Sequence, residues 1–248
     1  MDAVIIAAGY GSRLRDLSDS KPLTPVAGIP LIELGVLQAR AAGARRVVVV
    51  TGHAADRVEA FLASLAERAG VEIVAERVAD WSQPNGFSVI AGASRVARLG
   101  GQDFLLMMAD HIFSAEILVR LAREGAADRG VTLAIDRRLD NPLVDPDDAT
   151  WVKTDGNGRI AAIGKAIPAY DAVDCGAFLA TAELPEAIAE AISAGMPGSL
   201  SDGMQRLADK GRAATMEIGG AWWLDVDDPR AYAIAEAETP SRLALIYR

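Results

Sequence analysis

Short apolar runs alternate with segments of helical periodicity through the first half of the chain. Residues 3–8 and 46–51 are rich in β-branched side chains, which is typical of strands buried on both faces of a parallel sheet. Apolar positions three and four residues apart predict helices over 30–43 and around 58–65, and residues 72–75 predict a third strand. Strands and helices in this order predict a doubly wound α/β fold, with a mostly parallel central sheet flanked by helices.

The second half adds strands, helices and a hairpin. Its predicted strands are 104–108, 131–136 and 173–178, and its predicted helices are 115–125, 184–194 and 200–211. Asp155-Gly156-Asn157-Gly158 is a strong hairpin turn, and it is followed by a return strand over 159–164. We expect one domain over 1–248, with a first half of about 1–112 and a second half of about 113–248 that carries the hairpin.

The composition agrees with this class and limits the possible partners. A chain of 248 residues with 51% hydrophobic and 5% aromatic residues suits helices packed on a sheet. Its 25 basic and 34 acidic residues give a net charge of −9, so the chain has no electrostatic reason to approach a nucleic acid or an anionic membrane.

Cysteine content and the N-terminus bear on the compartment. The single cysteine, Cys175, excludes an internal disulfide and agrees with a reducing environment. The chain starts with MDAVII, which is not a secretory signal, and its apolar runs are far shorter than the ~20 residues of a membrane span. We expect a cytoplasmic protein without membrane insertion.

A glycine-rich loop directly follows the first predicted strand. Glycines without a Cβ let backbone N–H groups close on an anion, and Arg13 and Lys21 in the same loop supply positive charge. The loop therefore predicts a cradle for a triphosphate. Its nucleotide-binding candidates are Ala7, Ala8, Gly9, Gly11 and Ser12.

Two other phosphate-binding motifs fit the loop poorly. A dinucleotide-binding GxGxxG motif counted from Gly9 has Leu14 at its third glycine, and Thr51-Gly52 stands where an acidic ribose ligand is needed. The Gly-Lys-Ser/Thr ending of a Walker loop is missing from this stretch.

Carboxylates in the middle and near the end of the chain form a candidate metal site. Asp110 follows the strand over 104–108, at the edge where open α/β sheets bind ligands. Asp225 and Asp227 share one face of a predicted strand, and Asp228 and Pro229 suit the N-cap and first position of the last helix. Since hard cations prefer oxygen ligands, Asp110, Asp225 and Asp227 predict a Mg²⁺ site. We expect the neighbouring His111 to be packed or hydrogen-bonded and not to transfer protons.

The loop and the motifs after it resemble a known family. The stretch AAGYGSRL, followed by KPL, is similar to the signature of the sugar-phosphate nucleotidyltransferases, although most members have a proline where this chain has Ser20. The motifs MADH, DDATWV, IGK, DCGAF and WLDVD occur in the order seen in CTP:inositol-1-phosphate cytidylyltransferases. The resemblance spans nearly the whole chain.

The resemblance implies a Rossmann-like nucleotidyltransferase fold and a substrate pair. The enzyme would transfer a cytidylyl group from CTP to a phosphorylated alcohol, with inositol 1-phosphate favoured, and release pyrophosphate. Residues 77–88 would shape the base pocket, with Asn85, Gly86 and Ser88 as candidates, unless Asn85-Gly86 is only a turn and Ser88 an ordinary residue of a helix start. No phospholipid synthase portion follows, so we expect a free-standing transferase.

Two residues of the second half are candidates for binding the acceptor. Lys165 ends the predicted hairpin and can hold a phosphate as a point charge. Asp174 is an acidic group in an apolar setting, so it should face a cavity or a partner, and a polyol hydroxyl is one such partner.

A phosphate monoester is already an anionic nucleophile, so no general base is needed. Arg13, Lys21 and Lys165 are therefore expected to catalyse the transfer by neutralising charge and aligning the phosphates. Three alternatives remain open: a nucleotidyltransferase that uses another NTP with phosphocholine or a sugar 1-phosphate, a catalytically silent nucleotide-sensing subunit, and a glycosyltransferase. The sequence leaves the oligomeric state open.

Overall fold

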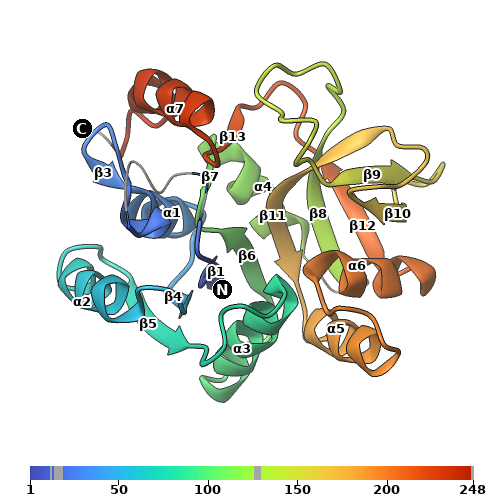
Figure 1. The fold of residues 1–248 in the computed structure, drawn as a ribbon, viewed down its shortest axis with the longest axis horizontal. Helices are drawn as coiled ribbons and strands as arrows, with labels where there is room; N and C mark the ends of the chain where they lie inside the picture. Colours follow the sequence, from blue (N-terminus) through green and yellow to red (C-terminus); the bar gives the residue numbers. More distant parts are fainter. Residues whose placement is uncertain (12, 14–18, 126–129, 247–248) are drawn as a thin grey trace.

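A nine-stranded sheet runs through the molecule. The computed structural model describes residues 1–11, 13, 19–125 and 130–246. The sheet has the order β10-β9-β11-β6-β1-β4-β5, and β8 and β12 extend it beside β11 (Figure 1). Its strands are β1 (Asp2–Ala7), β4 (Arg46–Thr51), β5 (Glu72–Arg77), β6 (Phe104–Met108), β8 (Val131–Asp136), β9 (Trp151–Thr154), β10 (Ile160–Gly164), β11 (Ala172–Ala180) and β12 (Ala213–Glu217).

The direction of the strands differs between the two halves of the sheet. Strands β6, β1, β4 and β5 are all parallel, as the alternation of strands and helices predicted. Strand β11 is antiparallel to β6, β8 and β9 and joins the two halves into one sheet. The α/β fold with a mostly parallel sheet is confirmed, and β9 and β10 form the expected antiparallel hairpin.

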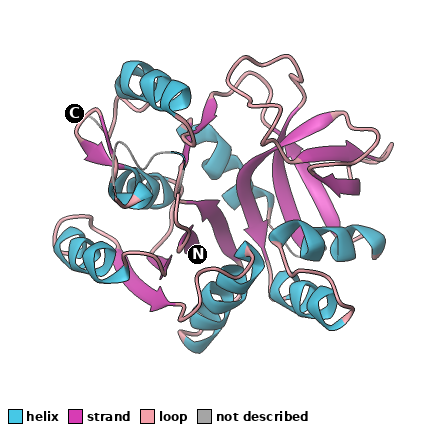
Figure 2. Ribbon diagram, in the orientation of Figure 1, coloured by secondary structure: helices cyan, strands magenta, loops and turns pink. Residues whose placement is uncertain are grey.

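Helices cover both faces of the sheet (Figure 2). They are α1 (Leu31–Ala41), α2 (Ala55–Ala66), α3 (Asn85–Arg98), α4 (Ala115–Glu124), α5 (Glu183–Ser193), α6 (Leu200–Asp209) and α7 (Pro229–Arg242). Successive side chains of β1 point to opposite faces, so Ile5 belongs to the apolar cluster that includes residues of α1, α2 and α4, whereas Val4 belongs to the cluster that includes residues of α3, α5 and α6. Among the helices in the described parts of the chain, none has the length and hydrophobicity that crossing a bilayer requires.

Several element ends lie where the sequence signals place them. Helix α1 is followed by Gly43 with a φ of +93°, and Asp228 caps α7 by accepting a hydrogen bond from the Ala231 N–H at 2.8 Å. We expected residues 77–88 to form a loop. The loop ends earlier, because α3 begins at Asn85 directly after Pro84. Pro84 occupies the N-cap position of that helix and has the extended backbone that is usual there.

Short pairings at the carboxyl edge of the parallel strands position the candidate site. Strand β7 (His111–Phe113) leaves the end of β6 and pairs antiparallel with β13 (Trp223–Asp225). A second small pair joins β2 (Pro25–Val26) to β3 (Ile29–Pro30), after the 3₁₀ turn η2 (Lys21–Leu23). The sequence did not predict β7 or β12, because these strands of three and five residues lack a distinctive pattern of their own.

Candidate active site

Lys21 lies nearly buried between two of the predicted metal ligands. Its side chain is 9% exposed, and its Nζ donates hydrogen bonds to Asp110 Oδ2 at 2.6 Å and to Asp227. Burial alone would lower the pKa of Lys21, but the carboxylates of Asp110, Asp225 and Asp227 outweigh it and raise that pKa. Lys21 is therefore held as a cation.

Gly11 makes room for this lysine. Its φ of +62° lies in the left-handed region, and a Cβ at this position would stand 2.5 Å from Lys21 Cβ. The glycine loop and the lysine ten positions later are thus packed against each other. A cavity of about 280 Å³ opens here, and Ala7, Gly9, Gly11, Arg13, Lys21, Asp110 and Asp227 are among its lining residues.

The pairing of β7 with β13 brings the acidic residues together. Asp225 lies opposite His111 in this ladder, and the Val226 N–H donates to the Asp110 carbonyl at 2.9 Å. Leu224 and Val226 are buried on the other face, as the alternation predicted. Backbone hydrogen bonds therefore place Asp225 and Asp227 beside Asp110, although they are more than a hundred residues apart in sequence.

His111 is a second cation beside these carboxylates. Its Nδ1 lies 2.8 Å from Asp110 Oδ1 and 3.7 Å from Asp225 Oδ1, and its ring stacks on Trp223 at 6.1 Å between centroids. Burial opposes the charged ring, but Asp225 and Asp110 outweigh it and raise the pKa of His111 to about 9. The expectation of a hydrogen-bonded, packed histidine agrees with this geometry.

The three predicted metal ligands fall into two overlapping groups. Ligand atoms of Asp110, His111 and Asp225 lie within 4.8 Å of one another, as do those of Asp148, Asp225 and Asp227. Asp225 Oδ1 is buried and has no hydrogen-bond partner among the described residues, and burial near other carboxylates raises the pKa of Asp225 to about 7. An unsatisfied carboxylate oxygen beside further carboxylates fits a hard divalent cation such as Mg²⁺.

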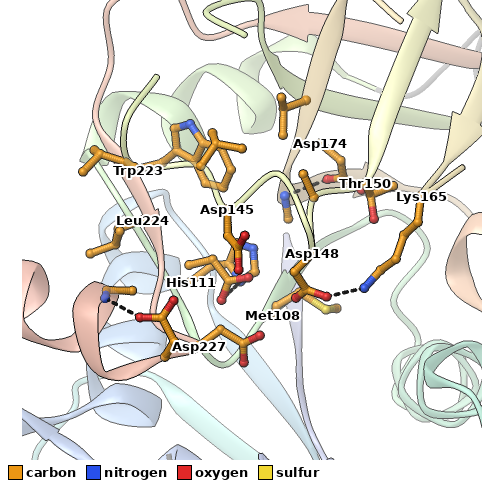
Figure 3. A pocket seen from close by; sticks show the side chains of 18 of the residues that line it. Met108, His111, Asp145, Asp148, Thr150, Lys165, Asp174, Trp223, Leu224 and Asp227 are labelled. Carbon is orange, nitrogen blue, oxygen red and sulfur yellow. Dashed lines mark hydrogen bonds and ion pairs between the residues drawn. The ribbon is translucent and has the colours of Figure 1, made fainter. Parts of the chain in front are cut away.

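Lys165 and Asp174 face a second cavity, next to the first (Figure 3). This cavity has a volume of about 230 Å³ and is lined by residues of both halves, including Arg13, Asn85, His111, Lys165 and Asp174. Lys165 Nζ forms an ion pair with Asp148 Oδ1, and Arg13 binds the other oxygen of Asp148 at 2.6 Å. Arg13 also pairs with Asp227.

Asp174 is one of the acidic groups that line this cavity. Its Oδ1 accepts a hydrogen bond from the Gly176 N–H at 2.7 Å. Burial raises the pKa of Asp174 to about 6, and the Gly176 N–H and the charge of His111 only partly oppose that rise. An anionic or neutral carboxyl group at this position can accept hydrogen bonds from hydroxyls of a ligand.

The remaining nucleotide-binding candidates differ in placement. Ala8 is buried, and its carbonyl accepts a hydrogen bond from the His53 N–H at 2.9 Å, whereas Ser12 lies outside the described residues. Asn85 Oδ1 accepts from the Leu200 N–H at 2.8 Å, and a Cβ at Gly86 would stand 2.2 Å from the Gly198 carbonyl oxygen. Together with the buried Ser88, these contacts connect the start of α3 to the segment that leads into α6.

No pattern in the sequence indicated a role for Asp148. The residue lies inside the DDATWV motif, which contributes to the resemblance, but nothing local indicates its contacts with Arg13 and Lys165. Those contacts join segments 135 and 17 residues away in sequence.

Comparison with known families agrees with this geometry. The model of the MobA-like NTP transferase domain matches residues 3–181, which include the glycine loop, Lys21, Asp110, Lys165 and Asp174. The chain belongs to the MobA-like NTP transferase family. This membership confirms the expected class of enzyme, a nucleotidyltransferase.

Relatives of this NTP transferase include two bifunctional proteins. The chain is 35% identical over 238 residues to the "Bifunctional IPC transferase and DIPP synthase" of Rubrobacter xylanophilus and 30% identical over 230 residues to the protein of that name from Aquifex aeolicus. These matches cover 94% and 92% of this chain but 51% and 49% of the two relatives. The chain therefore spans about half the length of the curated relatives it matches.

A solved structure has the same fold. The inositol-1-phosphate CTP transferase from T. maritima superposes with a TM-score of 0.79 at 25% identity, and the match covers 94% of each chain.

We predict that Gly11→Ala weakens nucleotide binding by the NTP transferase. The added Cβ would push Lys21 from its place, and losing one contact to a charged group costs about 1.5–3 kcal/mol, which is roughly tenfold or more in KM for the nucleotide. Steady-state kinetics would measure the change. Gly100→Ala is a matched control, because Gly100 has a φ of +80° and no atom within 4 Å of an added Cβ. Equal KM values in all three proteins would contradict the packing argument.

A second prediction concerns the pH dependence of stability at Asp174. Because its pKa is raised to about 6 in the folded protein, the ionised carboxylate opposes folding above that pH, and this penalty disappears towards pH 4. Asp174→Asn should therefore stabilise the fold by roughly 1–3 kcal/mol at pH 7.5 and have little effect at pH 4. Urea unfolding at both pH values measures the difference. An equal effect at the two pH values would show that the carboxyl group is not desolvated.

Proposed function

We propose that this chain transfers the cytidylyl group of CTP to inositol 1-phosphate and releases pyrophosphate. The observation that carries the proposal is the arrangement of Lys21, Arg13 and Lys165 along two adjoining cavities, with Asp110, Asp225 and Asp227 between them. The names of the Rubrobacter xylanophilus relative and of the T. maritima structure support CTP and inositol 1-phosphate as the substrate pair.

In the proposed reaction, an oxygen of the acceptor phosphate attacks the α-phosphorus of CTP. The new P–O bond forms as the bond from the α-phosphorus to the bridging oxygen breaks, and pyrophosphate leaves with that electron pair. The acceptor oxygen is already anionic, so no side chain has to remove a proton. The catalytic demand is alignment and neutralisation of charge on the phosphates.

The cations of the two halves would share the alignment of the phosphates and the neutralisation of their charge. Lys21, from the glycine-loop side, and Arg13 would contact the α-phosphate and the leaving pyrophosphate, since both line the cavity beside Gly9 and Gly11. Lys165 would hold the acceptor phosphate from the opposite side, and Asp174 would accept a hydrogen bond from a ring hydroxyl. The chain would act as one domain, because the continuous sheet joins the two halves.

Mg²⁺ would be held by Asp110 and Asp225, with Asp227 beside them, and would supply further positive charge to phosphate oxygens. The buried oxygen of Asp225, which has no hydrogen-bond partner among the described residues, supports this assignment. Lys21 and His111 offset the carboxylate charge around the same position.

A substrate panel tests the proposed function. Pyrophosphate release would be measured for each of the four NTPs with inositol 1-phosphate, phosphocholine, glycerol phosphate and glucose 1-phosphate. We expect CTP with inositol 1-phosphate to have the highest kcat/KM, by at least about tenfold, or 1.4 kcal/mol.

Each contrary outcome of the panel has its own meaning. A preference for another NTP with a sugar phosphate or phosphocholine would replace the substrate pair. Nucleotide binding without pyrophosphate release from any pair would indicate a silent sensing subunit. Sugar transfer from a nucleotide sugar without pyrophosphate release would indicate a glycosyltransferase.

Two substitutions test the proposed roles in catalysis. Lys21→Ala and Asp110→Asn should each lower kcat by ~10²–10³, the usual effect of removing one preorganised charge contact. Lys210→Ala is the matched control, because Lys210 pairs only with Glu190 on the surface among the described contacts. Wild-type kcat in either variant, measured by pyrophosphate release with folding checked by circular dichroism, would remove that residue from the mechanism.

A further inference from the structure

Asp148 connects the two phosphate-binding sides of the cleft through one carboxylate. Its Oδ1 pairs with Lys165 at the end of the hairpin, and its Oδ2 accepts from Arg13 of the glycine loop at 2.6 Å. Figure 3 shows Lys165 and Asp148 directed toward each other across the cavity. One side chain thus pairs with two of the three cations, Arg13 and Lys165, that the proposed reaction assigns to phosphate.

These ion pairs persist at neutral pH. Each oxygen of Asp148 faces a cationic side chain, Lys165 or Arg13, and nearby positive charge favours the ionised carboxylate. The side chain of Asp148 is 27% exposed, and those of Arg13 and Lys165 are 46% and 62% exposed. The pairs are therefore charged, open to solvent and accessible to an incoming anion.

A phosphate that binds Lys165 or Arg13 has to compete with this carboxylate. Phosphate oxygens need the same N–H donors, and a phosphate dianion beside an ionised carboxylate is repelled. Both oxygens of Asp148 belong to one rigid group. When an anion that binds one of the two cations displaces the Asp148 carboxylate, the other cation also loses its contact with Asp148.

We propose that Asp148 is a positioning residue that holds Arg13 and Lys165 together in the substrate-free enzyme and couples the binding of the two phosphates. This role rests on the proposed function, in which Arg13 serves the triphosphate and Lys165 the acceptor. The first phosphate to bind displaces the carboxylate, so the second meets a cation that has already lost its contact with Asp148, while Arg13 keeps its pair with Asp227. By linkage, each ligand then favours the other to the same degree.

The coupling should be modest. Couplings between binding sites typically lie between about 5-fold and 150-fold, and exposed ion pairs are weakened by solvent. We therefore expect a severalfold effect, at the low end of that range. Two anions in neighbouring cavities also repel each other, so the informative quantity is the difference between wild type and a variant without the carboxylate.

Asp148→Asn separates these contributions. Inorganic phosphate would be the probe for the Lys165 side and inorganic pyrophosphate the probe for the Arg13 side, titrated by isothermal calorimetry at a fixed Mg²⁺ concentration. In Asp148→Asn, phosphate should bind severalfold more tightly in the absence of pyrophosphate. Saturating pyrophosphate should then help phosphate binding severalfold less than it does in the wild type.

Asp145→Asn is the matched control. It removes one negative charge from the same edge of the cleft, but Asp145 lies 3.9 Å from Arg13 and does not contact Lys165 among the described residues. This variant should keep the wild-type coupling. Lys165→Ala should abolish the tight binding of inorganic phosphate. That result would show that phosphate binds on the Lys165 side of the cleft.

Two outcomes would overturn the proposal. One is the same coupling and the same phosphate affinity in Asp148→Asn as in the wild type. The other is a loss of Mg²⁺ affinity in Asp148→Asn with unchanged phosphate affinity, which would make Asp148 a metal ligand beside Asp225 and Asp227. Neither readout depends on turnover. The substrate panel can therefore contradict the proposed function while the titrations still show coupling, and the titrations can show no coupling while the panel supports the proposed function.

Discussion

The short antiparallel pairing of β7 with β13 is the constraint on which the rest of the site depends. It joins the end of a central parallel strand to a segment near the C-terminus, and it sets Asp225 opposite His111. Carboxylates confined to so small a space repel each other and would be costly to bury alone. The pairing is tolerable because Lys21 and His111 stand among those carboxylates as cations.

This arrangement explains how an acidic protein can hold polyphosphates. The chain has a net charge of −9, so its overall field does not attract anions. Positive charge is instead concentrated along the cleft, in Arg13, Lys21, His111 and Lys165, and each of these groups is already paired with an aspartate. Under the proposed function, phosphates would replace aspartates at these cations, so the net free energy of substrate binding would be smaller than that of the new ion pairs alone.

Local patterns predicted the regular parts of the fold well. The strand over 46–51, the glycine after α1 and the cap at Asp228 each follow from residues adjacent in sequence, and each lies where it was expected. The same reasoning predicted a loop up to residue 88 with no helix after it, and so missed α3 as well as the short β7. An element of three residues has too few positions to show a period, and β7 forms only because β13 supplies its partner.

Residue patterns along the chain were enough to predict the class of fold and the candidate residues of the cleft: a glycine loop with two cations, and aspartates at the ends of strands. These residues were candidates because their types recur wherever phosphate and a hard cation are bound. Only the tertiary structure decided which candidates meet. The contact between Arg13 and Asp148, which also pairs with Lys165, spans 135 residues, and packing of distant strands and loops created it. Such a contact leaves no periodic trace in the chain, since it depends on where whole elements lie and not on the order of neighbouring residues.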